Sequence, residues 1–432
     1  MKVLILGAGL IGICSAYFLR KEGYDVTVID RQKDVALETS FANGGQISVC
    51  YSEPWSNFGN VKKMLSWIGK EDSPLLIKPA FDLNQISWFS KFLMECFPKN
   101  NHENIKSMLE LSLFSRQTLQ EMRKELNLNY EQKTNGILTF YTSEKNFKSG
   151  IESAKFMSKF GCERFIKNTD ETLLIEPTLK NCTVPIYGSD YTPDDESGDA
   201  KIFTEELKKV CLSLGVEFLF DKEIIDVSYS NNNINSITFT DSSNVIHNDK
   251  NNIHISMKNN QLKEKISADI FVNCLGSYSS VFAKKVGINL PIYPAKGYSI
   301  TIPILENDLI NEVSLTDMDM KIVLTKIGKF LRVAGTAEFN GYNLEINKNR
   351  CLALINRTKI LYPNGLDYDN VSSWTGLRPA TPGMKPIIRQ EKINNLFTNS
   401  GHGTLGWTMA AGSGKRISQI INQSNRKRII FF

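Results

Sequence analysis

The residues best suited to chemistry are three glycines and a carboxylate near the N-terminus. The glycines are Gly7, Gly9 and Gly12, in a GxGxxG pattern, and Asp30 follows roughly 20 positions later. At this spacing the first glycine makes a tight turn, the second lets a pyrophosphate approach the backbone, and the third lets a helix pack closely on a strand. A carboxylate at the position of Asp30 can accept both hydrogen bonds from a ribose diol. The pattern predicts an adenine dinucleotide site, and a purely structural glycine turn is the alternative.

The elements around these residues follow the order strand, helix, strand. Residues 3–6 are an unbroken apolar run, which is typical of a parallel strand buried on both faces. A helix is predicted over residues 10–21, and Gly23 ends it before a second strand over residues 25–29. The first amides of that helix and the positive end of its dipole favour phosphate binding. A nucleotide-binding unit is therefore expected at the start of the chain.

Length and composition bound the rest of the fold. A chain of 432 residues is too long for one ordinary core, so two domains are expected. With 41% hydrophobic and 22% charged residues, the composition is that of a soluble globular protein. No apolar run reaches the length of about 18 residues that a membrane-spanning helix needs, and no signal-peptide pattern precedes the first strand. We therefore expect a cytoplasmic location.

Charge and metal-binding residues disfavour several other classes of function. The net charge of +5 is small for this length and no basic-aromatic stripe accompanies it, so nucleic acid is not an expected partner. Eight cysteines without a CxxC pair and only four histidines argue against a zinc site and a disulfide framework, so no metal is expected. The tail at residues 426–432 is basic and then apolar, which suits either contact with an anionic membrane surface or a frayed terminus.

The middle of the chain predicts a second domain interleaved with the first. Helical periodicity from about residue 86 to 126, followed by separate strands and helices, indicates an inserted substrate domain. The α/β pattern returns with a helix that Asp199 can cap and with a buried strand before Gly276. The nucleotide domain is assigned to 1–85, 195–228, 265–290 and 370–432, the substrate domain to 86–194 and 291–369, and an exposed polar insert to 229–264.

The chain resembles one family at seven motifs. They are GAGLIG with Asp30, SFANGGQIS, NCLGSYS, YPAKGYS, AGTAEF, WTGLRPATP and NSGHGTLGWTMAAGSG. Together and in this order they are similar to the bacterial FAD-dependent D-amino-acid dehydrogenases of the small-subunit type, within the D-amino-acid-oxidase-like superfamily. The resemblance covers nearly the whole chain. It implies an α/β fold in which a FAD domain of the two-dinucleotide-binding-motif type is interleaved with an α+β substrate domain on a mixed sheet.

The same resemblance assigns residues to FAD. It places the glycine turn and Asp30 at the ADP half, the loop after Asp30 along the pyrophosphate and isoalloxazine, and the last motif by the pyrimidine edge of the flavin. The cofactor-binding residues it implies are Gly7, Gly9, Leu10, Ile11, Gly12, Asp30, Arg31, Ser40, Asn43, Gly44, Gly45, Ile224, Gly276, Gly403, Thr404, Leu405 and Gly406.

Arg378 matches the arginine that clamps the substrate carboxylate in the D-amino-acid oxidases of the superfamily. The chemistry agrees, because a guanidinium is planar, permanently charged and bidentate. The alternative is a structural arginine in a surface salt bridge, which the neighbouring Gly376 and Pro379 argue against. His402 could be a general base or could shape its loop, and we favour the loop. Lys296 could face the flavin or be a solvated lysine at a strand end, and the sequence leaves both open.

One stretch departs from the pattern of the family. Members often have RPxTPDGxP, whereas residues 378–386 of this chain lack the aspartate and shift the glycine. The change bears on the geometry of this rim and on the substrate range.

The resemblance implies oxidative deamination of D-amino acids. Hydride transfer from the substrate Cα to flavin N5 gives an imino acid, which water converts to a 2-oxo acid and ammonia. By the same resemblance the electrons pass to a quinone-linked acceptor, which associates the enzyme with the inner face of the plasma membrane. The alternatives are a glycine, sarcosine or L-amino-acid oxidase of the same superfamily and a non-catalytic flavoprotein that serves a partner. An NAD-dependent dehydrogenase is disfavoured because the nucleotide fold is split along the chain.

Overall fold

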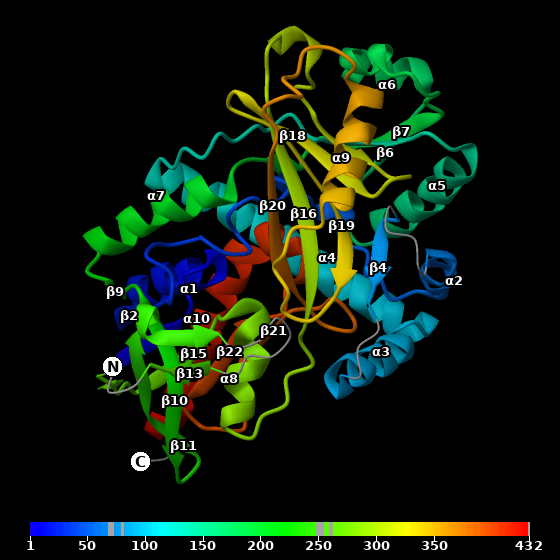
Figure 1. Ribbon diagram of the computed structural model, residues 1–432. Helices are drawn as coiled ribbons and strands as arrows, with labels where there is room; N and C mark the ends of the chain where they lie inside the picture. Colours follow the sequence, from blue (N-terminus) through cyan, green and yellow to red (C-terminus); the bar gives the residue numbers. More distant parts are fainter. Residues whose placement is uncertain (68–72, 79–81, 248–254, 259–261, 431–432) are drawn as a thin grey trace.

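A six-stranded sheet forms the nucleotide-binding half of the molecule (Figure 1). The computed structural model describes residues 1–67, 73–78, 82–247, 255–258 and 262–430. The strand order is β21-β22-β15-β1-β2-β9; β1 pairs in parallel with β2 and β15, and β21 runs antiparallel to β22. The strands are β1 (Lys2–Leu6), β2 (Asp25–Ile29), β9 (Glu217–Leu219), β15 (Ile270–Asn273), β21 (Ile387–Gln390) and β22 (Leu396–Ser400). The predicted α/β class is confirmed, and distant segments of the chain meet in this sheet.

Strand β1 is buried because both faces of the sheet are covered. Val3 and Ile5 belong to a core that contains residues of four helices, three of which cover the sheet, whereas Leu4 and Leu6 belong to a core shared with one helix and a small antiparallel sheet. This explains why residues 3–6 are apolar without alternation. The covering elements are α1 (Leu10–Lys21), α7 (Ala200–Ser213) and α10 (Gly406–Ile430) on the first face, and α8 (Ser279–Lys285), β10 (Lys222–Ser230), β11 (Asn233–Asp241) and β14 (Glu264–Ile266) on the second.

A nine-stranded mixed sheet forms the second half, and α9 (Lys348–Leu361) lies across it (Figure 1). Its path is β20-β16-β19-β18-β17-β5-β7-β6, and β4 pairs in parallel with the end of β19. The predicted mixed sheet is confirmed. Its strands are β4 (Leu75–Ile77), β5 (Ile137–Tyr141), β6 (Phe165–Lys167), β7 (Gly188–Thr192), β16 (Tyr293–Pro303), β17 (Ser314–Asp317), β18 (Ile322–Ile327), β19 (Phe330–Phe339) and β20 (Ser372–Ala380).

The helical stretch predicted from residue 86 to 126 is present as two helices, α3 (Leu83–Glu95) and α4 (Pro98–Leu126). Helix α4 packs on α10, where the Gly412 amide donates to Ser115 Oγ at 3.0 Å. Asp199 caps α7 as predicted, because its carboxylate accepts from the amides of Lys201 and Ile202. Further α-helices between residues 58 and 175 are α2 (Phe58–Trp67), α5 (Glu144–Ser158) and α6 (Thr169–Ile175). Two short strand pairs complete the fold: β3 (Gln46–Ile47) with β8 (Glu196–Ser197), and β12 (Val245–His247) with β13 (Ile255–Met257).

The structure corrects the predicted polar insert at 229–264. Strand β11 falls inside this stretch, pairs with β10 and β14, and buries Ile234, Ile237 and Phe239 in the core beneath β1. The many asparagines and lysines of the stretch predicted an exposed loop, but a strand with one solvated face also carries polar residues between its buried ones. Residues 248–254 and 259–261 lie outside the described part of the chain.

A second correction concerns residues 370–380, which the sequence assigns to the nucleotide domain. Strand β20 instead pairs with β16 over its whole length in the nine-stranded sheet. Strand β4, within the predicted 1–85 segment, also belongs to that sheet. The sequence of a single strand does not indicate which of two sheets the strand joins, so these two domain boundaries follow only from the observed strand pairing.

None of the helices in the described residues is long and apolar enough to cross a membrane. The predicted basic and apolar tail at 426–432 is helical as far as Ile430, where α10 ends. Residues 431–432 of that tail lie outside the described part.

Candidate active site

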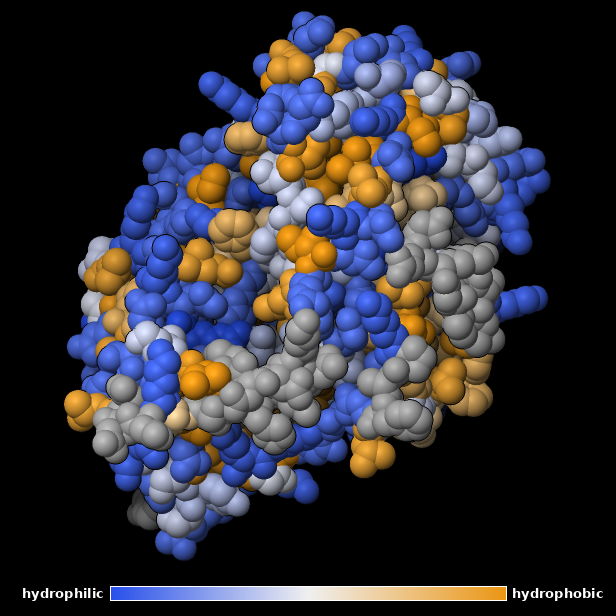
Figure 2. Space-filling view, in the orientation of Figure 1, coloured by the Kyte–Doolittle hydropathy of each residue, from blue (hydrophilic) through white to orange (hydrophobic). Residues whose placement is uncertain are grey.

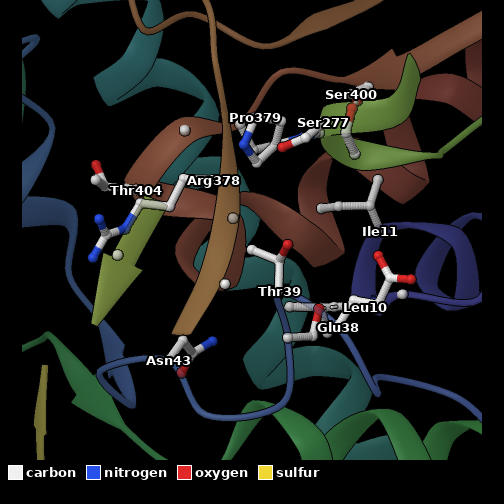
Figure 3. Close-up of a pocket in the computed structure, with 18 of the residues that line it drawn as sticks. Leu10, Ile11, Glu38, Thr39, Asn43, Ser277, Arg378, Pro379, Ser400 and Thr404 are labelled. Carbon is white, nitrogen blue, oxygen red and sulfur yellow. Dashed lines mark hydrogen bonds between the residues drawn. The ribbon is translucent and has the colours of Figure 1, made fainter. Parts of the chain in front are cut away.

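A cavity of about 850 Å³ is lined by residues from both sheets (Figure 3). Leu10 and Ile11 of α1 lie on one side of it and Arg378 of β20 on the other, with residues 38–43 between them. Arg378 and all of the predicted cofactor residues except Gly12 line this cavity. The fold therefore brings together residues that the sequence scatters from Gly7 to Gly406.

The structure gives a different reason for glycine at each of the three positions of the first turn. Gly7 has a φ of +103°, and a Cβ there would lie 2.7 Å from the Cys274 carbonyl oxygen of β15. A Cβ on Gly12 would overlap the Gly7 carbonyl oxygen, so the third glycine lets α1 pack on the turn, as predicted. A Cβ on Gly9 would meet only Ser40 Oγ, at 3.8 Å, although Gly9 lines the cavity. Packing within the protein therefore does not require glycine at position 9.

Asp30 lies at the end of β2 and closes the turn. Its carboxylate accepts from the Ala8 amide at 2.6 Å and from the Gln32 amide at 2.8 Å. Burial, with a smaller contribution from the negative charge of Glu38, raises the pKa of Asp30 to about 6. The two carboxylate oxygens have about four acceptor sites, so two bonds from the protein leave capacity for a ribose diol.

Arg31 lies beside this carboxylate and is held by three groups. Its guanidinium carbon is 4.0 Å from the centre of the Tyr278 ring. Its Nε donates to Glu38 at 2.6 Å, and Glu223 lies 4.0 Å from its Nη1. These carboxylates and the ring come from three elements, so Arg31 ties the β2, β10 and β15 ends of the cavity together.

The loop predicted to lie along the cofactor is pinned to the large sheet. Thr325 of β18 donates to the Gly44 carbonyl at 2.7 Å, and Ser299 of β16 donates to the Ala42 carbonyl at 2.7 Å. A Cβ on Gly44 would overlap Val323 of β18. Gly44 is therefore needed for contact with a strand, a reason that the sequence did not reveal. Asn43 Oδ1 accepts from the Gly45 amide at 2.9 Å, which closes the turn of this loop.

Two helices present their N-termini to the cavity. The first residues of α1 and of α10 line it, and neither helix has an acidic side chain in its first turn. The Leu10 amide donates to Ser40 Oγ at 3.3 Å. The first amides of a helix have no partner within the helix, so both ends favour negative charge in a bound ligand.

Arg378 is fixed by its backbone and by its guanidinium. The Leu377 carbonyl accepts from the hydroxyls of Thr39 and Ser277, each at 2.8 Å. Arg378 Nη1 donates to the Thr336 carbonyl of β19 at 2.8 Å. The guanidinium lies directly over Gly297 of β16, where any Cβ would overlap it. An arginine held in this way presents its remaining donors in a constant direction.

No carboxylate of the described residues lies within ion-pair distance of Arg378. Burial lowers the pKa of Arg378, the Tyr51 hydroxyl opposes this effect and the nearby Arg350 adds to it, and together they bring the pKa to about 10. Burial also raises the pKa of Tyr51 to about 12, so this residue stays a neutral phenol. The positive charge of Arg378 is therefore desolvated and lacks a protein counter-ion, which makes the cavity a favourable place for a carboxylate ligand.

His402 and Lys296 are now placed. His402 lines the cavity, and burial lowers its pKa to about 3, which keeps the ring neutral. A neutral buried ring agrees with a role in shaping the loop. Lys296 is buried outside the cavity lining, where its Nζ lies 3.3 Å from Glu338 Oε1 and donates to the Glu345 carbonyl at 3.0 Å. Both hypotheses for Lys296 are wrong, because it pairs with a carboxylate of the neighbouring strand.

The rim that departs from the family pattern is well packed. Met384 is buried with a φ of +60°, and its sulfur would lie 3.5 Å from a Cβ on Gly403. Thr381 donates to the Lys385 carbonyl at 2.8 Å, which closes the turn. A Cβ on Gly383 would lie 2.7 Å from Asn104 Nδ2. The shifted glycine thus faces α4, and Met384 occupies the position beside the last glycine motif.

Sequence reasoning did not single out Tyr51, Gly297 and Thr336, which contact or face Arg378. Gly297 and Thr336 lie in the motifs YPAKGYS and AGTAEF, but those motifs carry no sign of which strands pair. Tyr51 lies in a loop-rich stretch without a motif. The register of β16 with β19 and β20 places Gly297 and Thr336 beside Arg378.

The chain is similar to known proteins over almost its full length. The sequence profile of the family described as FAD dependent oxidoreductase matches residues 2–420. A D-amino acid dehydrogenase of Dechloromonas aromatica is 43% identical over 98% of this chain and 97% of its own. A D-amino acid dehydrogenase of Paramagnetospirillum magneticum is 37% identical over 98% of this chain and 95% of its own.

Among solved structures, glycine oxidase from Bacillus cereus has a TM-score of 0.71 at 18% identity, covering 98% of this chain and 95% of its own. An L-alpha-glycerophosphate oxidase from Mycoplasma pneumoniae with FAD bound has a TM-score of 0.68 at 17% identity, covering 98% and 94%. At these identities the likeness shows a shared fold.

Proposed function

Because the chain belongs to the family of FAD-dependent oxidoreductases, we propose that it uses FAD to oxidise D-amino acids to 2-oxo acids and ammonia. The observation that carries the substrate class is Arg378, a desolvated cation without a protein counter-ion in the cavity that also holds the dinucleotide turn. Relatives named D-amino acid dehydrogenase, similar over almost the whole chain, support the D configuration.

The residues present fit FAD. At Gly9 the surrounding protein leaves room that a pyrophosphate can approach, and Asp30 has acceptor capacity for a ribose diol. The N-termini of α1 and α10 add two sites that favour negative charge, and they would hold the diphosphate and the pyrimidine edge of the flavin, respectively. The predicted cofactor residues that line the cavity, and Gly12 behind the turn, are proposed to hold FAD.

The flavin, when bound, accepts the Cα hydrogen and two electrons of the substrate, which leaves an imino acid that water converts to the 2-oxo acid and ammonia. Arg378 binds the substrate carboxylate with its remaining donors, because the Thr336 carbonyl accepts from Nη1 and Gly297 leaves room for the guanidinium. Tyr51 stays protonated near Arg378 and can donate to the same carboxylate. Orientation by these groups replaces a general base, which agrees with the neutral, buried His402.

We further propose that the electron acceptor is a membrane quinone, reached from an apolar surface formed by α3 and by Phe97, which follows it. Leu83, Ile86, Met94 and Phe97 are exposed there by 81%, 57%, 62% and 57%. Figure 2 shows hydrophobic side chains gathered over this corner of the molecule. Phe97 packs against Phe58 of α2 with ring centres 5.5 Å apart.

Helix α2 connects this surface to the active site, because Asn60 and Met64 of α2 line the cavity. Lys62 of α2 and Lys99, two residues after Phe97, are exposed and suit contact with an anionic leaflet. The surface and the cavity rim therefore share one helix, which supports delivery of a lipid-soluble acceptor at this side. Flotation with vesicles that contain anionic phospholipid tests the surface: Ile86→Glu with Met94→Glu should abolish binding and leave flavin reduction by D-amino acids unchanged.

Anaerobic reduction of the bound flavin tests the activity. Purified protein is mixed with D-alanine, D-leucine, D-methionine, their L enantiomers, glycine and sarcosine, and the flavin absorbance is followed. We expect bleaching by at least one D-amino acid, at a rate well above that of its enantiomer. Bleaching by glycine and sarcosine alone, or by none of these compounds, would refute the proposed function.

A further inference from the structure

Strand β19 contains a bulge directly opposite Gly297. Gly335 pairs with Tyr298 and Glu338 pairs with Lys296, so two residues of β19 face one residue of β16. The two residues are Thr336 and Ala337. A bulge of this kind bends a strand and redirects the groups of the extra residue.

Thr336 has a φ of +56° in this bulge. Among the non-glycine residues with positive φ in the described ranges, it is the β-branched one, and β-branched side chains adopt this region at a cost in free energy. Glycine would take the same backbone conformation without that cost. Folding alone therefore gives no reason for threonine here.

The backbone of the bulge holds two arginines. The Thr336 carbonyl accepts from Arg378 Nη1 at 2.8 Å, and the Ala337 carbonyl accepts from Arg350 Nη2 at 3.0 Å. The consecutive carbonyls each fix one guanidinium. The strained backbone thus explains how Arg378 is positioned, but it does not explain the side chain of Thr336.

That side chain ends in a hydroxyl without a partner. Thr336 Oγ1 is buried, has no hydrogen bond within the described part of the chain, and belongs to a residue that lines the cavity. A buried hydroxyl without a partner costs free energy until a ligand satisfies it. It lies on the residue whose carbonyl holds Arg378, so it is near the group that would receive a carboxylate.

We propose that Thr336 is a second binding residue for the substrate carboxylate, with its hydroxyl as the donor; this inference rests on the proposed oxidation of D-amino acids at Arg378. The hydroxyl donates because a carboxylate only accepts, and its two oxygens have capacity for the guanidinium and the hydroxyl together. The Thr336 carbonyl positions Arg378, and the Thr336 hydroxyl contacts the ligand. The strain at residue 336 is thereby linked to binding.

The test compares Thr336→Val, which keeps the branched shape and removes the hydroxyl, with Thr336→Ser, which keeps the hydroxyl. Thr192→Val is the matched control, because Thr192 Oγ1 is also buried and without a partner in the described residues of the same sheet, but Thr192 does not line the cavity. Each holoenzyme is assayed with an artificial electron acceptor and the D-amino acid that the wild type oxidises fastest. Pyruvate, which has a carboxylate and no amine, serves as a competitive inhibitor.

We expect Thr336→Val to raise both KM and the inhibition constant of pyruvate about tenfold, with kcat changed less than about threefold. Thr336→Ser and Thr192→Val should stay within about twofold of the wild type in all three quantities. If the wild type is active and Thr336→Val leaves both KM and the inhibition constant of pyruvate unchanged, the role of Thr336 is overturned and the proposed function is not. A raised KM with unchanged pyruvate inhibition would overturn the assignment to the carboxylate. A wild type that no D-amino acid reduces would instead overturn the proposed function.

Discussion

Replacing Arg378 by methionine distinguishes a substrate-binding arginine from a structural one. Methionine keeps an unbranched apolar stem and removes the charge and all donors. Removing one partner of a desolvated ion pair costs about 3–5 kcal/mol, and each 1.4 kcal/mol is about tenfold. We therefore expect kcat/KM for the best D-amino acid to fall by between about 100-fold and several thousand-fold, with the flavin still bound.

The stability of the same variant should change little, for reasons that the structure supplies. The substitution loses the hydrogen bond to the Thr336 carbonyl, worth about 1 kcal/mol. It also removes a buried charge that has no counter-ion among the described residues and whose pKa burial lowers to about 10. Because these two effects oppose one another, the unfolding midpoint should shift by no more than about 3 °C.

Three measurements decide the question: flavin content by absorbance, the unfolding midpoint, and steady-state kcat/KM with an artificial acceptor. Arg389→Met is the control, because Arg389 is exposed and pairs with Glu391 at the surface. Arg378→Lys should recover only a small part of the activity, because an ammonium lacks the bidentate fork. Wild-type kcat/KM in Arg378→Met would refute the clamp, and loss of flavin with a collapsed midpoint would show a structural role instead.

Three further predictions follow from the contacts of the site. Gly9→Ala should weaken FAD retention at least about tenfold without lowering the unfolding midpoint of the apoprotein. Gly12→Ala should lower that midpoint, because a Cβ on Gly12 would overlap Gly7 and a Cβ on Gly9 would not. Scanning fluorimetry measures the midpoint, and flavin absorbance measures the retained FAD. Asp30→Asn should make FAD affinity independent of pH, whereas wild-type affinity should fall below a pH of about 6 as the carboxylate with its raised pKa takes up a proton, as measured by titration of apoprotein. His402→Asn should leave the pH profile of kcat/KM unchanged, because burial lowers the pKa of His402 to about 3. The unfolded chain protonates this histidine near pH 6.5, whereas the folded chain does so only near pH 3. As the pH falls from 6.5 to 3, the variant should therefore lose less stability than the wild type in denaturant titrations.

The first nucleotide-binding unit could be predicted from sequence because its requirements are local. Gly7 needs a positive φ and a close approach to β15, and Gly12 must pack on the turn five residues earlier. Such needs leave a fixed spacing of residue types in the chain. Gly44 shows the limit of this reasoning, because the pattern predicted contact with a cofactor and the structure adds a strand, at Val323, as a reason for the missing side chain.

The surroundings of Arg378 could not be predicted, because they depend on strand register. Gly297 lies opposite Gly376 in the pairing of β16 with β20, and the bulge at Thr336 lies on the other side of β16. A shift of one residue in either pairing would move these groups to the opposite face. Lys296 shows the consequence: the sequence left open whether it faces the flavin or solvent, and the alternation of the strand turns it to Glu338 and away from the cavity.

The two sheets divide the work of the site. The six-stranded sheet supplies the glycine turn and Asp30, and the nine-stranded sheet supplies Arg378 and the bulge at Thr336. Loop 40–46 connects them, because it is hydrogen-bonded to β16 and β18 while it lines the cavity. The altered rim at 381–385 follows β20 and packs on α4 and the last glycine motif, far along the chain from Asp30. A change there can alter the space around the substrate while the glycine turn and Asp30 keep their own contacts, so substrate range and retention of the adenine half of FAD need not change together in this fold.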